Sequence, residues 1–85
     1  MPPKTTTKLR DLRIRHGLTA AKLAAAAGVS PRTLHGIEMN RKRGRDTTRN
    51  GLVRALAQLS GESYETEDFF DEEGNPILMP NGHST

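Results

Sequence analysis

Apolar residues in the first part of the chain recur at helical spacing, in segments bounded by residues that begin or end helices. A first helix is predicted after the threonines at 5–7, running to about His16 and ending at Gly17. Leu9 and Leu12 lie on one face of this segment. The pattern therefore predicts an amphipathic helix that packs against the rest of the domain.

A second helix is predicted over residues 20–27. Thr19 is its N-cap, because a hydroxyl at this position accepts a hydrogen bond from the first turn. Leu23 is the one large apolar residue among alanines, which favour helix and let a neighbouring helix approach closely. Gly28 ends the segment.

A third helix begins at Ser30-Pro31, since a hydroxyl N-cap followed by proline at the first helical position is typical of a helix start. Leu34 and Ile37 are three residues apart and are predicted to face the core. Asn40 is predicted to end the helix, because asparagine tolerates the left-handed conformation better than most residues.

A fourth helix is predicted from a capping residue among Asp46, Thr47 and Thr48 to Gly61. Its apolar residues follow the i, i+3, i+4, i+7 pattern and are Leu52, Ala55, Leu56 and Leu59.

A short fifth helix is predicted to begin at Thr66, where a hydroxyl cap precedes two acidic residues. It would carry Phe69 and Phe70 back onto the body. The following tail contains one apolar run, at residues 77–79, and is either disordered or a single strand that pairs with another segment.

These segments predict a compact all-α fold with five helices. With 85 residues the chain is long enough for one domain with a modest core, which we place at residues 7–71. A basic N-terminal arm, residues 1–6, precedes the domain, and a flexible C-terminal tail, residues 72–85, follows it.

Charge is distributed unevenly along the chain. Residues 1–60 contain all 13 Lys and Arg and three acidic residues, a formal charge of +10. Residues 61–85 contain seven acidic residues and no Lys or Arg, a formal charge of −7. The basic body predicts a polyanionic partner, from which the acidic end should face away. A second hypothesis is that the acidic end folds over the basic loop and weakens binding at low salt.

Composition argues against several other functions. The absence of Cys excludes disulfides, thiolate metal sites and a cysteine nucleophile. No signal peptide and no apolar run of about 18 residues is visible, so we expect a cytoplasmic protein without a membrane partner. The three histidines (His16, His35 and His83) lack metal-ligand spacing, and the acidic residues cluster in one stretch. We therefore expect neither catalysis nor a cofactor.

The segment between the second and third helices carries the strongest functional signal. Gly28 permits a tight turn, Val29 packs between the two helices, and Ser30 caps the second of them. Such a helix-turn-helix unit presents the first residues of its second helix to a DNA major groove, which is about 12 Å wide. The sequence therefore predicts binding to double-stranded DNA.

Over residues 8–70 the order and spacing of these motifs resemble the Cro/repressor (XRE-type) helix-turn-helix proteins of phages and bacteria. The resemblance rests on Leu9-x-x-Leu12-Arg13, Gly17-Leu18-Thr19, Leu23-Ala24, Gly28-Val29-Ser30, Leu34, Ile37-Glu38, and the helix Leu52 to Leu59 followed by Thr66-Glu67-Asp68-Phe69. It implies a lambda-repressor-like fold and a transcriptional regulator, of the repressor kind, that binds an inverted-repeat operator as a homodimer. It also implies a structural ion pair between Arg13 and Glu38.

The resemblance implies base contacts from the third helix, by Pro31, Arg32, Thr33 and Gly36. Arg32 is the strongest reader, because Arg can donate two hydrogen bonds to guanine, worth about 1–3 kcal/mol of discrimination. Gly36 costs roughly 1 kcal/mol against Ala in a helix, so a close approach of DNA or of another helix is its expected reason. Phosphate contacts are expected from Thr19 and from His35, although His35 could also be exposed without a role.

A basic loop follows the third helix and is expected to contact phosphates through Asn40, Arg41, Lys42, Arg43 and Arg45. Members of the family commonly carry Gln after the position of Thr19, where this chain has Ala20, so affinity should depend more on the loop. Neutralising about five phosphates predicts a slope of log K against log salt of about −4 to −5. The alternative is that these loop charges are simply solvated.

Two alternatives to a repressor stay open. The run Gly-Val-Ser-Pro-Arg-Thr-Leu also occurs in MerR-type and excisionase-type winged helices, although strands follow it there and a helix is predicted here. An antitoxin would add a toxin-binding segment, for which residues 77–79 are the candidate. Candidate dimer contacts are the fifth helix with Phe69 and Phe70, or residues 77–79. No small-molecule ligand is expected, since no second domain forms a pocket.

Overall fold

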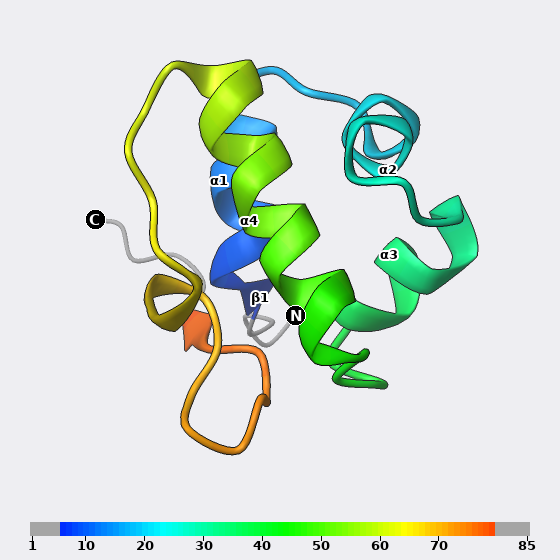
Figure 1. The fold of residues 1–85 in the computed structure, drawn as a ribbon, viewed down its shortest axis with the longest axis vertical. Coiled ribbons are helices and arrows are strands. Elements are labelled where there is room, and N and C mark those ends of the chain that lie inside the picture. The colour runs from blue at the N-terminus through cyan, green and yellow to red at the C-terminus, as the bar shows by residue number, and fades with distance from the viewer. Residues whose placement is uncertain (1–5, 80–85) are drawn as a thin grey trace, which may run out of the picture.

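The computed structural model describes residues 6–79, and within this range four α-helices are joined by tight turns (Figure 1). In chain order the elements are β1 (Thr6–Thr7), α1 (Lys8–Arg15), α2 (Ala20–Ala27), α3 (Pro31–Glu38), α4 (Asp46–Ser60), the 3₁₀ turn η1 (Thr66–Asp68) and β2 (Leu78–Met79). Helix α2 packs against both α3 and α4. Helices α2 and α3 lie on one side of α4, and η1 lies on the other. Most of the expected arm, residues 1–5, and the tail end, 80–85, fall outside the described residues.

Hydroxyl caps begin the first three helices, as predicted. Thr7 Oγ1 accepts a hydrogen bond from the backbone N–H of Arg10 at 3.3 Å, and Thr19 Oγ1 accepts one from Lys22 at 3.1 Å. Ser30 Oγ accepts one from the N–H of Thr33 at 3.1 Å. These caps satisfy N–H groups that have no partner within the helix, which fixes where each helix starts.

The core is formed by apolar side chains from every helix and from the segment after η1. Its buried members are Leu9, Leu23, Ala24, Leu34, Ile37, Leu52, Val53, Ala55, Leu56, Phe69 and Phe70. Val29 packs against this cluster from the turn between α2 and α3, as predicted. The prediction for Leu59 is wrong: it lies in the last turn of α4 and is 36% exposed.

Helix α4 starts one residue earlier than its predicted caps. Its N-cap is Arg45, which makes no side-chain capping bond, and Asp46 is the first helical residue. The Asp46 carboxylate instead pairs with Arg49 one turn later. A negative charge in the first turn favours the helix through its dipole, so Asp46 stabilises the start without acting as a cap.

The predicted fifth helix is wrong, because the chain forms only the three-residue turn η1 there. The N-cap is Glu65, whose N–H donates to Asp68 Oδ2 at 2.8 Å. The Phe69 carbonyl accepts a hydrogen bond from the N–H of Ile77 at 2.8 Å, so it does not accept one from the next turn of a helix. Phe69 and Phe70 nevertheless pack on the body, as expected.

The prediction of a flexible tail is wrong for residues 76–79. Leu78 pairs with Thr7, and Met79 with Thr6, in an antiparallel ladder of two residues per strand. The Ile77 carbonyl also accepts from the N–H of Lys8 at 2.8 Å. Of the two alternatives for this segment, the structure has the strand, and its partner is the start of the same chain.

Candidate nucleic-acid interface

The outward surface of α3 is made by its first residues. Pro31, Arg32 and His35 are exposed, Thr33 is half-buried, and Leu34 is fully buried on the opposite face. The exposed face therefore offers one guanidinium, one imidazole and one hydroxyl to a ligand. Of these groups, the guanidinium has the donor geometry that fits the edge of guanine.

Two hydroxyls at helix starts, those of Thr33 and Thr19, keep a free proton. Ser30 Oγ donates to Thr33 Oγ1 at 2.9 Å, which occupies an acceptor site of Thr33 and leaves its O–H proton unused. Thr19 Oγ1 accepts from the N–H of Lys22, so its O–H proton is also free to donate. Both hydroxyls lie at helix starts, where N–H groups favour an anion.

Gly36 is buried, although the sequence analysis gave it a base contact. A Cβ at this position would lie 2.6 Å from Cε of Lys42 and 3.1 Å from its Cδ and Cγ. The close approach that the glycine permits is therefore that of the Lys42 stem, which crosses α3. Lys42 itself is exposed, so its stem packs over Gly36 while the side chain remains accessible to a ligand.

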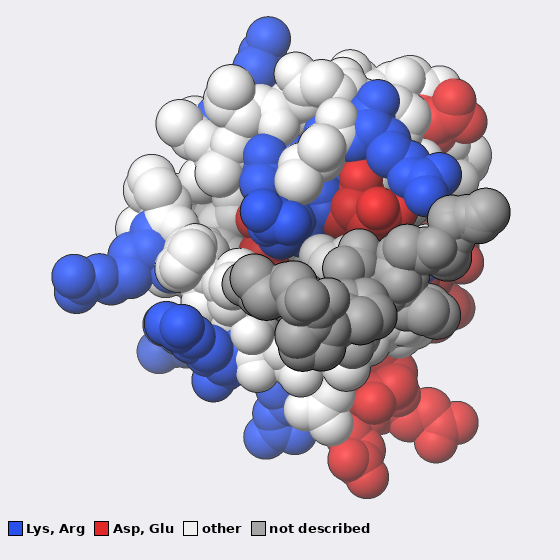
Figure 2. All heavy atoms as spheres, turned by 180° about the vertical axis from the view of Figure 1, so that it is seen from behind, with Lys and Arg blue, Asp and Glu red and all other residues white. Residues whose placement is uncertain are grey.

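The chain leaves the end of α3 through a left-handed residue, as predicted. Asn40 has φ +60°, and its N–H donates to the Ile37 carbonyl at 3.0 Å. The N–H of Arg41 donates to the Gly36 carbonyl at 2.8 Å, which completes a Schellman motif. This turn brings the loop alongside the end of α3. Figure 2 shows Lys and Arg side chains projecting at the left and lower left of this face, with others at its top, centre and upper right.

Every predicted phosphate-binding residue of the loop is exposed; these are Asn40, Arg41, Lys42, Arg43 and Arg45. Arg43 differs from the others because its Nη1 donates to the Glu73 carbonyl at 2.8 Å. His35 lies on α3, the loop follows its end, and Thr19 caps α2, so the predicted residues come from α3, from the loop after it and from the start of α2.

Arg49 organises the loop and was missed by the sequence analysis. Its side chain is only 15% exposed, and its Nη1 donates to the Gly44 carbonyl at 2.6 Å. The guanidinium also lies 5.9 Å from the centre of the Phe70 ring. The signal that could have located it is its position three residues after Asp46, a spacing at which side chains meet on one face of a helix.

Arg13 and Glu38 form the ion pair that the resemblance implied. Arg13 Nε lies 2.6 Å from Glu38 Oε2, and Nη2 lies 3.0 Å from Oε1. A third donor, Nη1, binds the Leu18 carbonyl at 2.7 Å. Thr7 adds a contact that the sequence did not reveal, because its hydroxyl donates to the Glu38 carbonyl at 2.9 Å. The end of α3 is thus fixed to α1.

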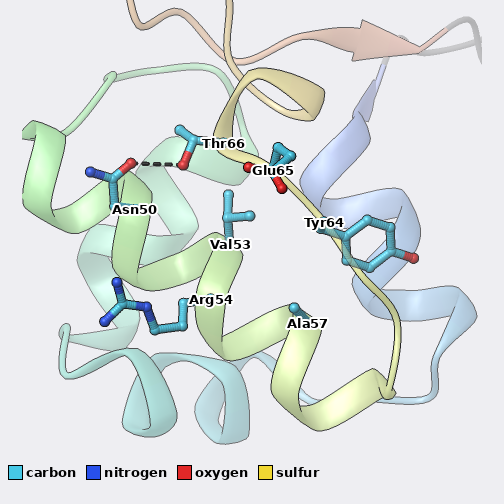
Figure 3. A pocket seen from close by; sticks show the side chains of 7 residues that line it. All are labelled: Asn50, Val53, Arg54, Ala57, Tyr64, Glu65 and Thr66. Carbon is cyan, nitrogen blue, oxygen red and sulfur yellow. Dashed lines mark hydrogen bonds between the residues drawn. The ribbon is translucent and has the colours of Figure 1, made fainter.

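A hollow of about 290 Å³ lies between α4 and the segment before η1 (Figure 3). Its lining residues are Asn50, Val53, Arg54, Ala57, Tyr64, Glu65 and Thr66. Thr66 Oγ1 donates to Asn50 Oδ1 at 2.7 Å, and the Glu65 side chain accepts from the N–H of Asp68. The Thr66–Asn50 bond therefore ties this segment to α4.

Tyr64 links the same segment to α1. Its hydroxyl lies 3.0 Å from Nε2 of His16, and its ring meets Phe69 edge-on at 5.2 Å. Burial raises the pKa of the Tyr64 phenol, and the negative charges of Glu62 and Asp68 raise this pKa further.

Two further kinds of feature are absent from residues 6–79. No helix there has the length and apolar character that crossing a membrane requires. No group of three or more His, Asp or Glu side chains in the same range is placed to hold a metal ion.

Two short helices joined by a tight turn, with the second exposed at its N-terminus, define a helix-turn-helix protein. The chain matches the family model described as "Helix-turn-helix domain" over residues 6–68 and belongs to this family, within the XRE/Cro-like class. The resemblance stated from the sequence is confirmed. No match was found among the curated proteins or among the solved structures. The family indicates sequence-specific DNA binding and transcription regulation, and such domains are typically not enzymes.

Proposed function

We propose that this protein is a transcriptional repressor of the phage or plasmid type that reads the DNA major groove with α3. The observation that carries the proposal is that Arg32 is exposed in the first turn of α3, while the exposed Lys42 of the basic loop packs its stem over Gly36 on the same helix. One group that can read guanine is thereby flanked by groups that can bind phosphate.

Base reading is assigned to the start of α3. Arg32 donates to guanine O6 and N7, and the free O–H proton of Thr33 donates to a base acceptor or its methyl group contacts thymine. Pro31 contributes apolar contact. Gly36 acts indirectly, because it leaves room for the Lys42 stem.

Phosphate binding is assigned to the two flanks of α3. Thr19 at the start of α2 donates its hydroxyl proton on one side. On the other side the contributing residues are His35, Asn40, Arg41, Lys42, Arg43 and Arg45. Phosphate contacts of this kind fix the orientation of a protein on the duplex without reading sequence.

A homodimer on an inverted repeat follows from the small number of base readers. One α3 carries a single strong reader, and two copies double the sequence that is read. Phe69 and Phe70 are buried in the core and so are not available as dimer contacts. Of the predicted interfaces, residues 77–79 stay a candidate, and Leu78 there is 44% exposed.

The structure gives the alternatives no added support. Helix α4 follows α3 where winged helices of the excisionase or MerR type would continue with strands. Residues 77–79, the candidate toxin-binding segment of an antitoxin, pair with the start of the same chain.

The proposal is tested by titrating a labelled duplex of mixed sequence at several salt concentrations. We expect log K to fall against log salt with a slope of about −4 to −5, and Arg41→Ala to reduce its magnitude by about one. Arg54→Ala is the matched control, because Arg54 is exposed on α4 beside the hollow and away from α3. A slope near zero, or equal effects of the two substitutions, would contradict the proposal.

A further inference from the structure

We infer that the acidic loop, residues 71–73, competes with DNA phosphate for the basic loop and thereby limits DNA affinity at low salt. The inference rests on the DNA binding proposed above. It assigns a determinant of affinity to residues outside α3 and outside the predicted DNA contacts.

Arg43 is the basic residue that the acidic loop holds. Its Nη1 donates to the Glu73 carbonyl at 2.8 Å, across 30 residues of sequence. A guanidinium bound in this way must exchange or share its donors before it can bind a phosphate in full. The other exposed cations of the basic loop, Arg41, Lys42 and Arg45, make no such side-chain bond within residues 6–79.

Arg49 fastens the two loops to each other. Its guanidinium donates to the Gly44 carbonyl of the basic loop. The same group lies against Gly74, where a Cβ would come within 2.8 Å of Cζ and 2.9 Å of Nη1. Gly74 has φ +85°, so glycine both permits this turn and leaves space for the guanidinium. The contact of Arg43 is therefore one part of a built interface between the loops.

The acidic loop has an internal structure that holds its charges in place. Asp71 Oδ1 accepts from the N–H of Glu73 at 2.9 Å and from that of Asn75 at 2.8 Å. The N–H of Asp71 donates to the Asn75 carbonyl, and that of Gly74 to the Asp71 carbonyl, both at 2.9 Å. Glu72 and Glu73 remain exposed on this turn. Figure 2 shows acidic side chains gathered next to the basic ones at the lower end of the molecule.

The distance between the loops is short compared with electrostatic screening. Arg43 contacts the Glu73 backbone directly, and the Glu73 carboxylate belongs to the same turn, where its Oε1 accepts from Asn75 Nδ2 at 3.4 Å. The Debye length is about 10 Å at 0.1 M salt, and a phosphate bound at Arg43 would therefore experience the acidic loop almost unscreened at lower salt. The acidic loop therefore lowers the affinity for every DNA sequence alike, and this reduction in affinity becomes smaller as the salt concentration rises.

The test compares the full-length protein with Glu72→Gln/Glu73→Gln, which removes two charges and keeps the Glu73 carbonyl. Glu62→Gln/Glu67→Gln is the control, with the same change in net charge. Both of its residues are exposed, and Glu62 follows the far end of α4, about 20 Å along that 15-residue helix from the basic loop. Affinity for one duplex is measured from about 50 to 300 mM salt, across which the Debye length shortens to below 10 Å, and melting curves verify the fold of each protein.

We expect the loop variant to bind about three- to tenfold more tightly than the natural protein at the lowest salt. The two should converge at the highest salt, with a steeper salt slope for the variant, while the control stays within about twofold of the natural protein. Equal gains in both variants, or no gain in the loop variant, would overturn the inference and leave DNA binding intact. Failure of all three proteins to bind any duplex would instead refute the proposed function.

Discussion

The Arg13 guanidinium and the Glu38 carboxylate meet through two hydrogen bonds and are the most enclosed ion pair among the described residues, with side chains 11% and 3% exposed. Removal of one partner leaves a buried charge without compensation, which typically costs about 3–5 kcal/mol. We therefore expect Glu38→Ala to lower the free energy of unfolding by that amount in a denaturant titration.

An exposed pair in α1 provides the control for that prediction. Arg15 and Asp11 lie 2.9 Å apart at i, i+4, with side chains 67% and 24% exposed. Pairs of this kind contribute about 0.3–0.5 kcal/mol, so Asp11→Asn should change stability by no more than that. A loss in Glu38→Ala as small as in Asp11→Asn would show that the buried pair does not fix α3 to α1.

The substitution Gly36→Ala is expected to change stability and DNA affinity in opposite directions. Alanine in a helix is favoured over glycine by roughly 1 kcal/mol, and the atom that its Cβ meets is near the end of the flexible Lys42 side chain, which can move. We expect a gain in unfolding free energy of about 0.5–1 kcal/mol together with weaker DNA binding, because Lys42 is displaced.

Lys42→Met is the partner measurement for Gly36→Ala. It should weaken DNA binding without the gain in stability, and the two substitutions combined should weaken binding no further than Lys42→Met alone. Additive losses of affinity in the double variant would mean that Gly36 acts on DNA by a route other than Lys42.

Asn40 is the one described non-glycine residue with a positive φ, at +60°. Ala at this position should cost about 1–2 kcal/mol, since its Cβ opposes the left-handed conformation, whereas Gly should cost nothing. Thermal or denaturant unfolding of Asn40→Ala and Asn40→Gly measures the difference. Equal stability of the two variants would contradict the account of how α3 ends.

The raised pKa of Tyr64 predicts that the folded protein loses stability at alkaline pH. Its pKa is raised in the folded protein, so the neutral phenol is favoured there. The stabilisation is complete below the usual pKa of 10 and is lost as pH rises through the folded value. Tyr64 is the single tyrosine, so the ultraviolet absorbance of its phenolate reports this titration directly. Tyr64→Phe should show a weaker decline of unfolding free energy above pH 10 than the natural protein.

Local signals explain why the helix-turn-helix unit could be predicted from the sequence. Interactions between residues close in sequence determine the features of this unit. These features are the helix caps at Thr19 and Ser30, the turn at Gly28 and the left-handed conformation of Asn40. The ends of α2 and α3 therefore agree with the prediction, and so does the buried position of Leu34.

Contacts between distant segments explain what the sequence did not reveal. Thr66 is followed by acidic residues that favour a helix, but the Phe69 carbonyl binds Ile77 instead of a residue in the next turn. The residues next to Gly36 in the sequence do not indicate that the Lys42 side chain packs over it. The role of Arg49 likewise depends on Gly74, which lies 25 positions later in the chain. Such contacts arise from tertiary packing, which the conformational propensities of neighbouring residues do not predict.

The central claim, that α3 reads sequence through Arg32, is tested most directly by selecting bound duplexes from a random DNA pool at about 150 mM salt, near physiological ionic strength. The natural protein and Arg32→Ala are selected side by side. We expect an enriched inverted repeat, with one guanine preference in each half-site relaxed by the substitution, which corresponds to about 1–3 kcal/mol. Enrichment of no sequence, or of the same repeat with unchanged preferences in Arg32→Ala, would contradict this account.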